Sequence, residues 1–175
     1  FNKKYYLIIS GIGKINSALS VADIFYRFKQ DFNNVWINIG IAGHKTFQIG
    51  KLLAVNKITD YESENSFYPF FLKNINLSKE NCMTFSKPNY NYSKRLYDME
   101  ASGFFFAANK FSTKELIHSL KIVSDNESFN SQTFSKEKIK RLIQANIDEI
   151  LDFVEIIEST WNNFFFQKNK IEQKI

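Results

Sequence analysis

The sequence predicts a single α/β domain with three layers, in which helices cover both faces of a central sheet. Short apolar, β-branched runs alternate along the chain with longer segments whose apolar residues recur at helical spacing. Glycine-rich stretches directly follow two of the expected strands, as at the ligand-binding edge of open α/β sheets. The length of 175 residues, 44% of them hydrophobic, is enough for one domain over residues 1–175 with a substantial core.

The first expected unit is a strand, a glycine turn and a helix. Residues 4–9 form a continuous apolar and aromatic run, typical of a buried central strand. The turn Ser10-Gly-Ile-Gly-Lys14 follows, and a helix is expected from there to about residue 30. Because the chain opens on this strand at Phe1, we expect one or two further elements upstream in the natural protein.

The second unit repeats this order, with a strand over residues 35–39 and a glycine loop over residues 40–44. Four of the six glycines lie in these two loops. Glycine is needed where the backbone turns with positive φ or approaches a ligand closely, so the loops suggest one shared site. A tight strand-to-helix turn is the alternative for each loop. The first loop lacks the third glycine of the dinucleotide fingerprint, and the lysine of a P-loop is not in its proper place.

Further elements are expected along the rest of the chain. Strands are predicted at residues 51–58, 81–85 and 118–123, with a long excursion over 61–80 that holds a short edge strand, and a loop over 89–95. Ser135 is the expected N-cap of one long amphipathic helix reaching Val154, and the tail beyond Trp161 is expected to fray or to pack on a partner.

An acidic pair, Asp98 and Glu100, opens an apolar helix within the stretch Leu96–Lys110. Small residues in this helix, Gly103 among them, predict close packing against its neighbours. The two acids either complement the helix dipole or belong to a site.

Four segments in order resemble the nucleoside phosphorylase superfamily, most closely the methylthioadenosine/adenosylhomocysteine nucleosidases. They are Ser10-Gly-Ile-Gly-Lys14, Asn38-Ile-Gly-Ile-Ala-Gly43, Asp98-Met-Glu-Ala101 and Val123-Ser-Asp125, and the likeness runs to about residue 160. The resemblance implies a phosphorylase/hydrolase-like fold with a mixed central sheet. It also implies an enzyme that cleaves the N-ribosidic bond of an adenine or other purine nucleoside, without a cofactor.

The resemblance also implies roles for eight residues. Asp125 would protonate the purine N7, oriented by Ser124, while Glu100 would hold the ribose hydroxyls with Met99 packed on the sugar. The backbone of Ala42 and Gly43 would line ribose and base, Gly11 would edge the pocket for phosphate or water, and Lys121 would keep the charge of the family's arginine without its bidentate fork.

The chemistry fits these residue types. A purine anion leaves poorly, so an acid must protonate it as the bond to an oxocarbenium-like sugar breaks. A carboxyl that is half-buried at a strand end can have its pKa raised enough to hold that proton. The alternative for Asp125 is a turn-forming aspartate.

Several points stay open in the sequence. Ile41 stands where many relatives have a serine, which favours water over phosphate as nucleophile; phosphorolysis and a non-catalytic nucleoside-binding protein remain alternatives. Phe85 and Tyr90 are the candidates for stacking on the purine, and His44 is expected to be a plain loop histidine. His118 and Cys82 have no ligand-spaced partners, so no metal site is predicted.

Composition bounds the partners and the compartment. The net charge of +5 comes from lysines scattered among acids, which gives little support for nucleic-acid binding. Cys82 is the single cysteine, which fits a reducing compartment. No apolar run reaches transmembrane length, so we expect a cytoplasmic protein without membrane contact, and a homodimer, as is common among the relatives.

Overall fold

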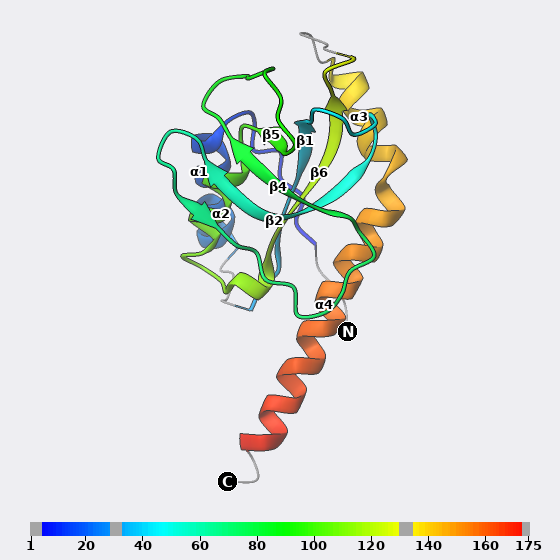
Figure 1. The fold of residues 1–175 in the computed structure, drawn as a ribbon. Helices are drawn as coiled ribbons and strands as arrows, with labels where there is room; N and C mark the ends of the chain where they lie inside the picture. Colours follow the sequence, from blue (N-terminus) through cyan, green and yellow to red (C-terminus); the bar gives the residue numbers. More distant parts are fainter. Residues whose placement is uncertain (1–4, 29–32, 130–134, 173–175) are drawn as a thin grey trace.

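The computed structural model describes residues 5–28, 33–129 and 135–172. Helices α1 and α2 lie on one face of a curved mixed sheet, and α3 and α4 lie on the other (Figure 1). The predicted three-layer α/β class is therefore confirmed. The elements in chain order are α1 (Lys14–Arg27), β1 (Trp36–Gly43), β2 (Leu52–Asp60), β3 (Ser66–Phe67), β4 (Lys79–Thr84), β5 (Leu96–Asp98), α2 (Ala101–Ala108), the 3-10 turn η1 (Lys114–Leu116), β6 (Ile117–Asp125), α3 (Lys136–Ala145) and α4 (Ile147–Glu172).

The sheet is mixed and partly closed. Its strand order is β3-β2-β4-β5-β1-β6, and the start of β2 also pairs with β6 in antiparallel fashion. Strands β1 and β6 run parallel, so Gly43 and Asp125 come to lie at the same end of the sheet. Strand β5 runs antiparallel to β1 and meets it at that end, where Gly43 pairs with Tyr97.

Each face of the sheet carries its own apolar core. The core under α1 and α2 includes Val21, Phe104 and Phe105 against residues of β1, β2 and β6. The core on the other face joins β2 and β6 to one side of α4 through Ile150, Phe153 and Ile157. Buried on both faces, β6 has no exposed residue, as expected for a central strand of a parallel pair.

The close packing predicted for α2 is confirmed at Gly103. A Cβ on this residue would lie 2.8 Å from the Cα of Lys14 and 2.7 Å from its carbonyl carbon. Only glycine allows the start of α1 to approach α2 so closely. This contact matters for the site, because it fixes the glycine turn at residues 10–14 beside the acidic segment at residues 98–100.

The predicted strand over residues 4–9 is wrong for the part that is described; Lys4 lies outside the described residues. Residues 5–9 form no strand, and Leu7 and Ile9 are 89% and 94% exposed. A strand exists only where a neighbour accepts and donates its hydrogen bonds, and none of the described strands pairs with this segment. Helix α1 follows as predicted and ends at Arg27. Its apolar residues Ile15 and Leu19 face outward, while Ser17 and Val21 are buried.

The glycine loop predicted at residues 40–44 is also wrong, since β1 continues through Gly43. Positive φ occurs at Gly11 and Gly13, as a glycine turn requires, but not at Gly40 or Gly43. Hydrogen bonding to β6 keeps residues 40–43 extended. Strand β5 was not predicted, because three residues are too few to show an alternating pattern.

The edge strand predicted in the 61–80 excursion is confirmed as β3, and the strands predicted at 51–58, 81–85 and 118–123 are confirmed as β2, β4 and β6. Ser135 is confirmed as an N-cap, since its Oγ accepts from Lys138 N at 3.2 Å. The single long helix divides at Asn146, whose side-chain amide donates to Leu142 O and Gly50 O. Beyond Trp161, where fraying or partner packing was predicted, α4 continues to Glu172. Among the described residues, no helix is long and apolar enough to cross a membrane.

Candidate active site

Asp125 ends β6 and is 3% exposed. Burial raises the pKa of its carboxyl to about 6, partly opposed by the positive charge of Lys138. Ser124 lies beside it, and its Oγ donates to Oδ1 of Asp125 at 2.5 Å. A carboxyl with this pKa gains and loses a proton close to neutral pH, as a general acid must.

The end of β1 lies directly against this acid. Gly43 pairs with Asp125 on one side and with Tyr97 on the other. The next backbone amide, that of His44, donates to the carbonyl of Asp125 at 3.1 Å. The structure thus brings together four of the predicted site residues, Ala42, Gly43, Ser124 and Asp125.

Glu100 is the residue before α2 and is partly buried. Its Oε1 accepts from Gly13 N at 2.9 Å, although 87 positions separate the two residues. Gly11 is exposed, with φ of +80°, two residues earlier in the same turn. The glycine turn therefore contacts the acidic segment that contains Met99 and Glu100. Both this group and the Asp125 group border β5, since Glu100 follows Asp98 closely and Gly43 pairs with Tyr97.

Lys121 has a different environment from the one expected of a substrate contact. Its side chain is fully buried, and its Nζ lies 2.7 Å from Oδ2 of Asp98, which is also fully buried. To reach β5 from β6 the side chain crosses β1 over Gly40, where a Cβ would lie 3.1 Å from Nζ. Burial alone would raise the pKa of Asp98, but Lys121 together with hydrogen bonds from Thr84 and Ala101 holds it below its usual value. The charged pair thereby fixes the segment that ends in Glu100.

A chain of polar contacts leads from Asp98 to the surface. Thr84 Oγ1 donates to Asp98 at 2.6 Å and accepts a hydrogen bond from the backbone amide of Ser102. The side-chain Oγ of Ser102 in turn donates to Oδ2 of Asp60 at 2.7 Å. The same oxygen of Asp60 binds the ammonium of Lys14 at 2.7 Å. Burial raises the pKa of Asp60, but the hydrogen bonds from Lys14 and Ser102 outweigh it and lower the pKa to about 2.

The sequence analysis missed Lys14, Asp60 and Ser102 as a group. The available signal was a strand closed by Asp60 and a lysine that ends the glycine turn. Nothing in their spacing indicates that these residues meet.

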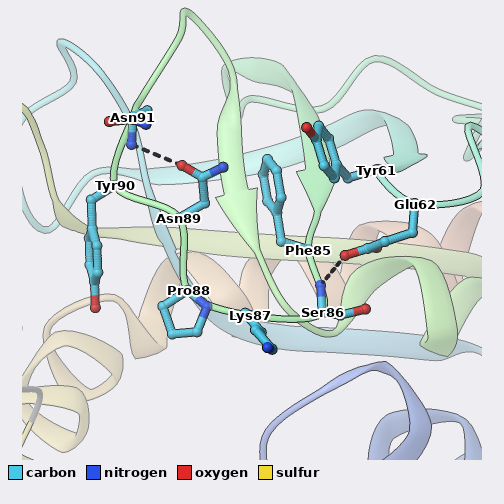
Figure 2. Close-up of a pocket in the computed structure, with 9 residues that line it drawn as sticks. All are labelled: Tyr61, Glu62, Phe85, Ser86, Lys87, Pro88, Asn89, Tyr90 and Asn91. Carbon is cyan, nitrogen blue, oxygen red and sulfur yellow. Dashed lines mark hydrogen bonds between the residues drawn. The ribbon is translucent and has the colours of Figure 1, made fainter.

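An open pocket of about 510 Å³ lies beside β4, lined by Tyr61, Glu62 and residues 85–91. In Figure 2, Phe85 and Tyr61 lie on one side of this pocket, and Tyr90 and Asn89 lie on the other. The ring of Phe85 is already packed, with its centroid 4.6 Å from that of Tyr61 and 4.7 Å from that of Tyr97. Tyr90 is only partly buried, so it is the better placed of the two candidate aromatics for meeting a ligand here.

His44 lies in the loop that follows β1, as predicted. It is 2% exposed, and its Nδ1 accepts from the amides of Thr46 and Phe47. Its ring stacks on that of Phe47, with 4.1 Å between centroids. Among the described residues, no group of three or more His, Cys, Asp or Glu side chains is arranged to hold a metal ion.

The fold is that of the phosphorylase/hydrolase-like α/β proteins. No protein-family model matches the sequence, and no curated protein matches it. Solved structures do match. The 5'-methylthioadenosine/S-adenosylhomocysteine nucleosidase of Campylobacter jejuni has 18% identity and a TM-score of 0.64, over 83% of this chain and 78% of that one.

Two further matches agree. The methylthioadenosine/adenosylhomocysteine nucleosidase of Colwellia psychrerythraea, solved in complex with adenine, has 15% identity and a TM-score of 0.62, over 87% of this chain and 76% of that one. The futalosine hydrolase of Helicobacter pylori has 16% identity and a TM-score of 0.52, over 80% and 77% of the two chains. The resemblance drawn from four short motifs is thus confirmed at the level of the fold.

Proposed function

We propose that the protein cleaves the N-ribosidic bond of a purine nucleoside, with water as the attacking group. The observation that carries this proposal is Asp125, a buried carboxyl with a pKa of about 6 at the end of β6. This carboxyl lies on a fold that the chain shares with nucleosidases of 18% and 16% sequence identity.

Asp125 is the general acid in this proposal. As the bond breaks, negative charge develops on the purine, and a proton delivered to N7 makes the base a neutral leaving group. Ser124 donates to one carboxyl oxygen and so leaves the other to face the base. The backbone of Ala42 and Gly43, held beside Asp125 by strand pairing, lines the ligand.

Glu100 supports the sugar in this proposal. Gly13 N orients Oε1, and Oε2 accepts from the ribose hydroxyls, with Met99 packed on the ring. Positive charge develops on the sugar in the transition state, so a carboxylate near its hydroxyls strengthens its hold there. Gly11 edges the space for the nucleophile. We assign Lys121 a positioning role, since its ammonium contacts Asp98 inside the core.

The test is release of free purine from a panel of nucleosides, with and without phosphate. Release in the absence of phosphate supports the proposal, and strict dependence on phosphate would indicate phosphorolysis instead. Binding without release would indicate a non-catalytic nucleoside-binding protein. Asp125→Asn should abolish most of the release, and the matched control Asp23→Asn, which alters an exposed aspartate on α1, should not. Equal rates in the two variants would contradict the assignment of Asp125.

A further inference from the structure

The ring of Tyr92 fills the space that a side chain on Gly43 would take. A Cβ on Gly43 would lie 2.6 Å from Cζ of Tyr92 and 2.7 Å from its Oη, well inside van der Waals contact. Because Gly43 does not have positive φ, close approach of this ring, and not a turn, is what requires glycine here.

Strand pairing places this ring relative to the acid. Gly43 is paired with Asp125 on β6 and with Tyr97 on β5, and the register of β1 against β6 shifts at this point. The Tyr92 ring therefore lies on the residue of β1 that pairs with Asp125, one strand away from the acid. It also packs edge-to-face on Tyr97, with 5.6 Å between centroids.

The ring thus covers the backbone against which the proposed function places the purine. It is flat, aromatic and partly buried, as a bound base would be. An aromatic side chain in this position competes with a ligand for the same surface.

Tyr92 belongs to the loop of residues 86–95, which joins β4 to β5. Near its two ends, Ser86 N donates to Glu62 and Tyr97 Oη donates to Ser93 Oγ. Between them, Tyr90 and Tyr92 contact each other edge-to-face, with 6.3 Å between centroids. Tyr92 is in ring contact with Tyr90 and Tyr97, and a base that displaces the ring must replace these contacts.

We propose that Tyr92 gates the base site: its ring covers Gly43 in the empty protein, and a base enters only when the 86–95 loop carries the ring away. This inference rests on the proposed function. Displacing the ring gives up its contact area, which a bound base then replaces.

The gate is tested by calorimetric titration of adenine, adenosine and uridine into the full chain and into Tyr92→Ala. If the closed form is the more populated one, its removal should raise the apparent affinity by the inverse of the fraction of protein that is open. For a closed form favoured only modestly, this gain is about three- to tenfold. We expect the same gain for adenine and for uridine, because the ring must open at the same cost whichever base then enters. Lys94→Ala, which alters an exposed residue of the same loop, should change neither affinity.

Two results would overturn the gate. Weaker binding of adenine by Tyr92→Ala would make the ring a stacking partner, and unchanged binding would place it off the path of the ligand. In the second case adenosine still binds, so the proposed function stands while the gate fails. If neither protein binds adenine or adenosine, both proposals fail.

A second measurement tests the position of the ring without any ligand. Gly43→Ala should lower the urea midpoint of the wild-type chain, because the new methyl group meets the ring. The same substitution in the Tyr92→Ala background should lower it much less. Additive midpoint shifts would mean that the ring does not lie on Gly43, which would overturn the gate whatever the titrations give.

Discussion

Asp125→Asn should make the protein more stable at neutral pH while removing most of its activity. In the folded chain, burial raises the pKa of this carboxyl from 3.8 to about 6. Above pH 6 the native protein therefore holds a buried carboxylate at a cost that the unfolded chain does not have. Asparagine keeps the shape and the hydrogen bond from Ser124 and removes the charge.

The size of the effect follows from the shift. Each pKa unit corresponds to about 1.36 kcal/mol, so the shift from 3.8 to about 6 sets an upper limit near 3 kcal/mol. Solvent at the rim screens part of this, and we expect roughly 1 to 2 kcal/mol. Because the pKa of Asp125 is raised in the folded state, the wild type has no penalty below pH 3.8, where the carboxyl is protonated in both states. The free energy of unfolding of the wild type then falls as the pH rises through 6. The stability advantage of the variant therefore grows between pH 3.8 and 6 and is constant above pH 6.

Activity should change in the opposite direction. If Asp125 delivers the proton to the purine, turnover should fall by roughly 10²- to 10⁴-fold in the variant, while nucleoside binding is retained. In the wild type the protonated form is the active one. The rate should therefore fall above pH 6, where the carboxyl with a pKa of about 6 loses its proton.

Urea denaturation at intervals from pH 4 to pH 8 measures the stability difference, and purine release on the same samples measures activity. Asp60→Asn is the control with opposite sign, because the pKa of Asp60 is lowered to about 2. That variant should be less stable than the wild type by a constant amount from pH 8 to pH 4, and the deficit should shrink only as the pH falls from 3.8 through about 2, so its series is extended to that pH. A flat difference for Asp125→Asn from pH 4 to pH 8 would refute the raised pKa and with it the argument for a general acid.

Three further predictions concern the segments around the site. Glu100→Gln should weaken binding of adenosine by roughly 1.5 to 3 kcal/mol, for loss of a charged acceptor, and leave free adenine unaffected in calorimetry; equal weakening of both would make Glu100 a structural helix-start acid. Gly103→Ala should cost roughly 1 to 3 kcal/mol in urea denaturation, because its methyl group meets the backbone of Lys14 and the two helices must part; an unchanged midpoint would contradict the close contact. Lys121→Met should cost roughly 3 to 5 kcal/mol by leaving Asp98 buried and unpaired, and adding Asp98→Asn should restore much of that loss; a double variant no more stable than the single one would contradict the pairing.

The sequence predicted best where a residue's role depends on its neighbours in the chain. A run of buried apolar residues such as the one before Asp125 indicates a strand, and a polar residue that follows the run must lie at the carboxyl end of that strand. Ser135 was likewise recognised from the helix that follows it. In both cases, the interaction that decides the structure lies within one element.

Prediction failed where the deciding partner is distant. Residues 5–9 have the composition of a buried strand but no paired neighbour among the described strands, and composition cannot report a missing neighbour. The Lys14–Asp60–Ser102 group was missed for the same reason, since three elements supply one residue each.

The glycines show how a motif can indicate the fold although the reason first given for two of its glycines was wrong. Gly11 and Gly13 have positive φ and make the expected turn, whereas Gly40 and Gly43 lie in an extended strand. Gly40 gives passage to the lysine side chain that reaches Asp98, and Gly43 gives room to the ring of Tyr92. A glycine required by φ and a glycine required by a distant side chain look the same in one sequence. The motif resemblance was nevertheless informative, because the combined spacing of glycines and acids reflects contacts among elements that local patterns do not contain.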